Sequence, residues 1–300
     1  PDLPPQVDAR ASRWQSTFVD VPGGQLFARV SLAGGGRPWL GLHDPAGSSR
    51  RVEGLLTPWL GERPLLALDN PGNGESDPLL PREQISTANY AKYAEAALDA
   101  LGWDEVDVLG RYSGGQVAME LAARRPGRVR HIVQAGVQIF DPAEIDSLLA
   151  NYTPSIAPRW DGSHLVTAWA IVRDMSLFWP WYDRRASAVI RRDAAIDANS
   201  LDRRVQDLLK IGDAWQDFYH RKYRQLKCAR WRSGWRNCRC PACSPTIPAQ
   251  HPGRGWRRPR RARRASRSAN STPTRWPGGA ASRSSCRGTE SRAAAAVARE

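Results

Sequence analysis

A short apolar run followed by a glycine-rich turn constrains this chain more than any other feature. Residues 106–109 read Val-Asp-Val-Leu, which predicts a strand, and the turn Gly-Arg-Tyr-Ser-Gly-Gly at 110–115 leads directly into a helical stretch. Glycines flank such a turn because its central residue lies in strained backbone, where a Cβ on a neighbour would collide with the strand or helix. The sequence therefore predicts a sharp strand-to-helix elbow, with Tyr112 as the turning residue and Ser113 next to it.

Two further motifs precede this elbow, and each follows an apolar strand-like run. Residues 39–42 lead into His-Asp-Pro-Ala-Gly at 43–47, and residues 65–68 lead into Asp-Asn-Pro-Gly-Asn-Gly-Glu-Ser at 69–76. With the elbow, these motifs make residues 15–225 resemble the α/β-hydrolase superfamily. Its members have a His-Gly loop that builds half of an oxyanion hole, a D-x-P-G-x-G-x-S turn, and a nucleophile elbow G-x-S-x-G.

Strand-like and helical stretches alternate along the first half of the chain. An antiparallel hairpin is expected at 16–21 and 25–32, strands at 38–42, 64–68, 106–109 and 129–133, and helices at 88–101 and 114–125. After residue 141 the pattern is helical, and Asp141 before Pro142 is expected to cap the first helix. The fold class is therefore α/β, with a doubly wound, mostly parallel sheet that lacks its last strands and a helical cap. The expected domains are 1–140 for the first part of the core, 141–226 for the cap and 227–300 for a tail.

Composition changes abruptly near Lys227. Residues 1–227 carry 27 Lys and Arg against 28 Asp and Glu, whereas residues 228–300 carry 17 Arg, 2 Glu and neither Lys nor Asp. The formal charge of +14 therefore resides in the tail. With no Leu, Phe, Tyr or Met, the tail cannot bury enough apolar surface to offset chain entropy, and we expect it not to fold alone.

Two interpretations of the tail remain open at this stage, disorder and a GC-rich gene read out of frame. All five cysteines lie there, but Cys238-x-Cys240-x2-Cys243 is not a standard zinc spacing and His251 is the sole tail histidine, so we predict no metal site. The Arg-rich run 254–267 has the charge of a nucleic-acid-binding arm, but no recognition fold accompanies it. Nucleic-acid binding is kept as a second alternative function only.

The resemblance assigns the catalytic chemistry to the elbow. Tyr112 stands where the family has its nucleophilic serine, and Ser113 is the other catalytic candidate. The family's acid and base follow on loops after late strands, which would lie beyond Lys227, so neither can be identified in this chain. One oxyanion donor is also absent, because Asp44 replaces the second residue of the His-Gly pair and Pro45 has no N–H.

Six residues are candidates for contact with substrate. His43, Asp44 and Pro45 form the loop beside the elbow, and His164, Trp179 and Trp181 belong to the expected cap. The pair Trp179-Pro180-Trp181 is typical of a helix break that lines a pocket.

The function implied is hydrolysis of a small organic substrate, an ester, lactone, epoxide or C–C bond, with activity impaired in this chain. The alternative is a non-catalytic protein that binds a small ligand on the same fold. We expect no cofactor, a small-molecule substrate or ligand, no membrane segment and a cytoplasmic location, since no run approaches the ~18 apolar residues of a membrane span. The oligomeric state and the substrate are left open.

Overall fold

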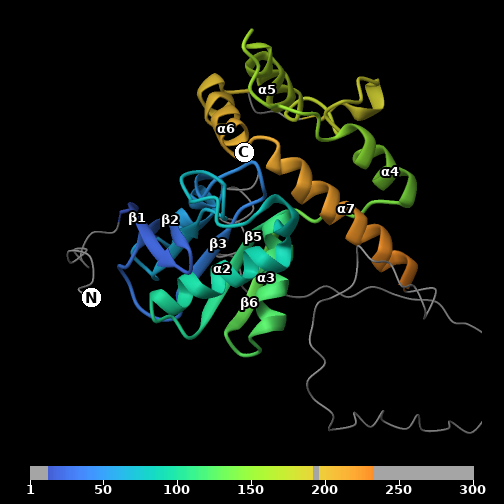
Figure 1. Ribbon diagram of the computed structural model, residues 1–300. Coiled ribbons are helices and arrows are strands. Elements are labelled where there is room, and N and C mark those ends of the chain that lie inside the picture. The colour runs from blue at the N-terminus through green and yellow to red at the C-terminus, as the bar shows by residue number, and fades with distance from the viewer. Residues whose placement is uncertain (1–12, 192–195, 233–300) are drawn as a thin grey trace, which may run out of the picture.

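The computed structural model describes residues 13–191 and 196–232, which contain one six-stranded mixed sheet (Figure 1). The strand order is β1-β2-β4-β3-β5-β6; β1, β2 and β4 pair antiparallel, whereas β4, β3, β5 and β6 are parallel. The predicted hairpin, parallel strands and fold class are confirmed. The strands are β1 (Gln15–Val21), β2 (Gly24–Ser31), β3 (Trp39–Leu42), β4 (Leu65–Leu68), β5 (Val106–Arg111) and β6 (Val129–Ala135).

Helices alternate with the strands in the first half and then run without interruption by strands. They are α1 (Arg50–Leu56), α2 (Thr87–Ala100), α3 (Ser113–Arg124), α4 (Pro142–Asn151), α5 (Ser163–Asp174), α6 (Ala198–Ile211) and α7 (Ala214–Arg232), with 3-10 turns at Thr57–Trp59, Arg82–Gln84 and Ala186–Ala188. The sequence predicted α2 and α3 to within one residue at each end but gave no indication of α1. Asp141 caps α4 in a reciprocal capping box with Glu144, as expected.

Alternate side chains of the central strands pack on opposite faces of the sheet. Leu40 and Leu42 of β3 join the main core, to which α2 and α3 also contribute. Trp39 faces the other way, into a smaller core with the buried leucines of α1, and a Cβ at Gly41 would collide with Val52. This alternation gives three layers and leaves the carboxyl ends of the parallel strands at one edge.

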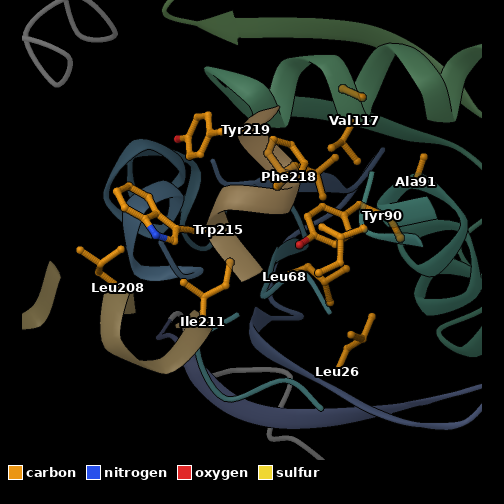
Figure 2. Close-up of a cluster of buried hydrophobic side chains, with 14 of the residues drawn as sticks. Leu26, Leu68, Tyr90, Ala91, Val117, Leu208, Ile211, Trp215, Phe218 and Tyr219 are labelled. Carbon is orange, nitrogen blue, oxygen red and sulfur yellow. The ribbon is translucent and has the colours of Figure 1, made fainter. Parts of the chain in front are cut away.

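The helical segment 142–232 lies on one side of the sheet and docks through α6 and α7 (Figure 1). Figure 2 shows Trp215 and Phe218 of α7 in one cluster with Tyr90 of α2, and the Tyr90 and Phe218 rings stack with centroids 5.4 Å apart. Ser48 Oγ, in the loop after β3, donates a 3.0 Å hydrogen bond to Asp207 of α6. The segment is therefore anchored directly above the loops that follow β3 and β4.

Strand β6 is the edge of the parallel part of the sheet among the described residues, and β1 is the opposite edge. Its Ile132 and Val133 are 36 % and 47 % exposed, although β5 beside it is almost wholly buried. Native proteins usually cover or charge their edge strands, so exposed apolar side chains on an edge strand are unusual. The late strands expected beyond Lys227 fall largely outside the described residues, although α7 itself continues past Lys227 to Arg232. Among the described helices, none is long and apolar enough to cross a membrane.

Candidate active site

Tyr112 is the turning residue between β5 and α3, as the glycine spacing predicted. Its φ of 45° and ψ of −109° lie in a region that side chains with a Cβ rarely occupy, and its N–H donates to Ala135 O at 2.9 Å. A Cβ at Gly110 would overlap the backbone of Gly115. The residues 110–115, called the elbow from here on, are therefore held in a strained turn by close packing.

The Tyr112 ring leans toward the end of β6. It lies so close to Gly136 that a Cβ at this glycine would overlap the ring, and Arg111 Cζ lies 5.0 Å from the ring centroid. A phenol in this place fills room that a serine would leave open. Ser113 follows as the first residue of α3 and is 1 % exposed.

A buried lysine of α7 bonds to Ser113. Lys222 Nζ donates to Ser113 Oγ at 2.9 Å and to Gln138 Oε1 at 3.1 Å, and lies 5.5 Å and 5.4 Å from the ring centroids of Tyr219 and Tyr223. Burial lowers the pKa of Lys222 to about 8, and the negative charge of Asp44 opposes this change only in part. A neutral amine is thus accessible near physiological pH.

Arginines surround Asp44 in the loop after β3. Arg111 Nη1 lies 2.9 Å and Arg51 Nε lies 3.5 Å from Asp44 Oδ1, and all three side chains are at most 17 % exposed. Burial alone would raise the pKa of Asp44, but Arg51, Arg111 and then His43 bring it down to about 2. Asp44 is therefore ionised, and its carboxylate holds the elbow residue Arg111 in place.

A third arginine reaches this group from α6. Burial, and then the positive charges of Arg51 and Arg111, lower the pKa of Arg204 to about 10, although Asp44 and Tyr152 act in the opposite direction. Arg204 Nη1 donates to Ser176 at 2.8 Å, whereas its buried Nε has no hydrogen-bond partner among the described residues. We call Arg51, Arg111 and Arg204 the arginine cluster.

The remaining candidates in the loop after β3, His43 and Pro45, contribute to the structure of the loop itself. His43 Nε2 accepts from Asn70 N at 3.0 Å and its Nδ1 lies 2.7 Å from Asp44 O, so both ring nitrogens are taken by backbone groups. Pro45 offers no N–H, and the next N–H, of Ala46, bonds to Asn73 Oδ1 at 3.2 Å. This loop is thus tied down by its own hydrogen bonds.

The three candidates from the helical segment lie in different surroundings. Trp179 stacks on Phe140 and meets Tyr152, an aromatic group that also contacts Tyr223 beside Lys222. Trp181 Nε1 donates to Tyr152 O at 2.8 Å. His164 instead accepts from Arg159 N at the start of α5, a local contact that does not connect it to the elbow. Trp179 and Trp181 therefore both contact Tyr152, which connects them to the site.

Sequence reasoning missed Lys222, Arg204 and Arg51, although the helix pattern contained a signal for two of them. Lys222 interrupts the apolar face of α7, three and four residues after the buried Tyr219 and Phe218, and Arg204 stands beside the buried Val205, three residues after Leu201 on α6. A charge on the core face of a helix is costly unless it has partners, so such positions mark candidate sites.

Residues 47–247 match the family described as alpha/beta hydrolase fold. The chain belongs to this family. It is 30 % identical over 157 residues to a 2-hydroxy-6-oxononadienedioate/2-hydroxy-6-oxononatrienedioate hydrolase of Klebsiella pneumoniae, covering 48 % of this chain and 52 % of that protein. It is 38 % identical over 77 residues to a 2-hydroxymuconate semialdehyde hydrolase of Pseudomonas putida, covering 25 % and 27 %. The chain therefore spans about half, or less, of these curated relatives.

Solved structures share the fold at low sequence identity. A putative alpha/beta hydrolase from Nostoc is 17 % identical with a TM-score of 0.55, covering 73 % of this chain and 75 % of that one. An epoxide hydrolase from Vigna radiata is 14 % identical with a TM-score of 0.55, covering 74 % and 76 %. These similarities show that the chain shares its fold with these structures.

Proposed function

We propose that this chain is a hydrolase of small organic substrates that carry a carboxylate, with its reacting centre at the elbow and the helical segment 142–232 as cap. The observation that supports this most is the excess of buried positive charge beside the elbow. The arginine cluster and Lys222 lie near the ionised carboxylate of Asp44. Buried charges are normally paired, so an anionic group of a ligand would balance the excess positive charge of this site.

The nearest other carboxyl group offsets this charge incompletely. Asp207 of α6 is bound by Ser48, and burial raises its pKa, which favours its neutral form more than in an exposed aspartate. Guanidinium groups bind carboxylates through short, charge-assisted hydrogen bonds, often two at once. A substrate carboxylate at Arg204 Nε, the buried donor without a partner, would complete this group of charges.

Relatives support the same substrate class. The Klebsiella relative is named for its action on a dienedioate, a compound with two carboxylates. The bond that this chain cleaves, whether C–C, ester or lactone, is not specified by the arginine cluster. A cytoplasmic location stays part of the proposal.

The rate is expected to be low compared with a hydrolase that has the usual Ser, His and acid. Tyr112 replaces the serine at the turning position, and its ring fills room that a serine would leave open. Pro45 supplies no oxyanion donor, and His43 is committed to backbone partners. What remains at the elbow is the amino end of α3, whose first N–H groups have no acceptor within the helix and can stabilise a developing negative charge.

Replacement of Arg204 by Met is expected to weaken the binding of a dicarboxylate such as adipate by about tenfold or more, the loss of one hydrogen bond to a charged group. Isothermal titration calorimetry on the full chain measures this at neutral pH. Arg203→Met is the matched control, since Arg203 is the exposed neighbour on the same helix, 53 % exposed and 4.0 Å from Asp197. Equal adipate affinity in the Arg204 and Arg203 variants would contradict the proposal.

The alternative, a non-catalytic ligand-binding protein, is favoured by one observation, the tyrosine at the turning position. It predicts adipate binding that depends on Arg204 but no turnover of any ester. Binding and turnover assays on the same preparation therefore separate the two functions.

A further inference from the structure

We propose that Ser113 and Lys222 form a nucleophile and general-base pair where α7 meets the start of α3, beside a groove that Lys222 lines. This pair would supply the covalent chemistry that Tyr112 is poorly suited to perform. The inference deepens the proposed function and rests on it for the substrate class. Ser–Lys pairs carry out acyl transfer on unrelated folds, so the chemistry does not need a histidine.

The contact between the two side chains is direct and buried. Lys222 Nζ lies 2.9 Å from Ser113 Oγ, within the range needed for proton transfer, and the two residues are 4 % and 1 % exposed. Gln138 Oε1, 3.1 Å from Nζ, fixes the amine from the loop after β6. The base is thus oriented by a third group, as catalytic nucleophile and base pairs require.

Burial favours the neutral form of Lys222 more than an exposed site would, and the charge near it opposes this only in part. In the described part of the chain no carboxylate oxygen forms an ion pair with Nζ; its polar contacts are the serine and the amide, with Tyr219 and Tyr223 from its own helix. Asp44 acts on it electrostatically from the loop after β3, and Glu120 of α3 lines the same groove. A lysine desolvated in this way is a suitable general base, with its pKa near 8.

A groove lies beside the pair, and Lys222 is the member of the pair that lines it. It has a volume of about 320 Å³ and is lined by side chains of α2, α3 and α7, with Lys222 on its wall. Gln116 and Glu120 line it from α3, three and seven residues after Ser113 and hence on the same face of that helix. The groove is lined by Thr87, Gln116, Met119, Glu120, Ala123, Lys222, Gln225 and Leu226.

The reaction balances with these groups and water alone. Neutral Lys222 accepts the Ser113 hydroxyl proton as Oγ attacks the carbonyl carbon of an ester, and N–H groups in the first turn of α3 would stabilise the oxyanion formed. The C–O bond to the leaving alcohol breaks, and the lysine ammonium returns its proton to the alcohol oxygen. Water, deprotonated by Lys222, then attacks the carbonyl carbon of the acyl-serine. The C–Oγ bond breaks, the lysine ammonium returns its proton to Ser113 Oγ, and the acid is released.

Lys222 is less suited to packing in this place than an apolar residue would be. This favours a role for Lys222 as a base. Its aliphatic stem lies among aromatic rings where Met or Leu would fill the same space, and its buried ammonium costs stability at neutral pH. Residues that lower stability in this way are concentrated at active sites.

The test is covalent modification of the full chain by phenylmethanesulfonyl fluoride, with the modified residue located by peptide mass spectrometry. We expect the adduct on Ser113, at a rate that rises with pH through about 8. Lys222→Met and Lys222→Arg should both slow it by about 100-fold or more, the usual contribution of a general base, and remove the inflection near pH 8. Lys227→Met, on the same helix but paired with Asp146 at the surface, should react like the unmodified chain.

Circular dichroism shows whether each variant is folded, and Lys222→Arg provides a second replacement at the same position. Together they distinguish loss of the base from loss of the fold. An adduct on Tyr112, no adduct at all, or modification of Ser113 with an unchanged pH profile in folded Lys222→Met would overturn the inference. Adipate binding requires no reaction at Ser113, so a failed labelling experiment with intact adipate binding rejects the pair alone. Lost adipate binding would instead reject the proposed function.

Discussion

Replacement of Asp44 by Asn is expected to destabilise the protein by about 3 kcal/mol at pH 7, the cost of removing one partner from a buried ion pair. The carboxylate lies 2.9 Å from Arg111 and 3.5 Å from Arg51, and it also offsets the charges of Arg204 and Lys222. An amide would leave these cations facing one another in the interior. Urea unfolding followed by circular dichroism measures the difference.

The effect of Asp44 has a defined dependence on pH. Its folded-state pKa of about 2 lies below the ordinary 3.8, so its contribution is fully present above pH 4 and is lost as the pH falls toward 2. The difference in the free energy of unfolding between the unmodified chain and Asp44→Asn should therefore become smaller at acidic pH. Asp146→Asn is the control, because its surface pair with Lys227 contributes at most about 1 kcal/mol. Similar losses in the two variants would rule out a special role for Asp44.

Replacement of Lys222 by Met is expected to stabilise the protein at pH 6 to 7 while it removes reactivity at Ser113. A pKa of about 8 in the folded state against 10.5 in the unfolded state corresponds to a cost of about 3 kcal/mol below pH 8. The methionine removes that cost but leaves Ser113 and Gln138 without their donor, at about 1 to 3 kcal/mol. A net gain of about 1 kcal/mol should remain.

The sign of this effect should change with pH. The unfolded state binds more protons between pH 8 and 10.5, so the stability of the unmodified chain rises over this range, whereas that of Lys222→Met does not. The variant should thus be the more stable form at pH 6 and the less stable form near pH 10, by thermal or urea unfolding. A difference that is constant between these pH values would show that Lys222 is not a buried, titrating amine.

Much of the core could be predicted from short-range patterns. The glycines at 110, 114 and 115 indicated the strained turn, because a Cβ at Gly110 or Gly114 meets backbone atoms of Gly115 or Leu42. Continuous apolar runs at 38–42 and 64–68 indicated buried parallel strands, which β3 and β4 are. The other two expected parallel strands were also found within two residues of their bounds. Helix α1 was missed because its seven residues contain Gly54 and present only three buried apolar side chains, too short a pattern for a helical period.

The charged part of the site could not be predicted because it is assembled from distant segments. Arg51, Arg111 and Arg204 come from three helices or strands separated by 60 residues or more, and Lys222 lies 109 residues after Ser113. Periodicity marks Lys222 as lying on a core face, but only the docking of α7 against α3 shows which residue it meets. His164 was predicted from its place in the expected cap, and its contact with Arg159 shows why that place alone is insufficient.

The most direct test of the account is the ratio of kcat/KM for two matched nitrophenyl esters, the mono-ester of adipic acid, which carries a free carboxylate, and the ester of hexanoic acid, which does not. We predict slow turnover, with kcat/KM at least about tenfold higher for the carboxylated ester, equivalent to about 1.4 kcal/mol. This preference should be lost in Arg204→Met and kept in Arg203→Met. Absence of turnover, equal kcat/KM for the two esters, or a preference that survives in Arg204→Met would contradict this prediction.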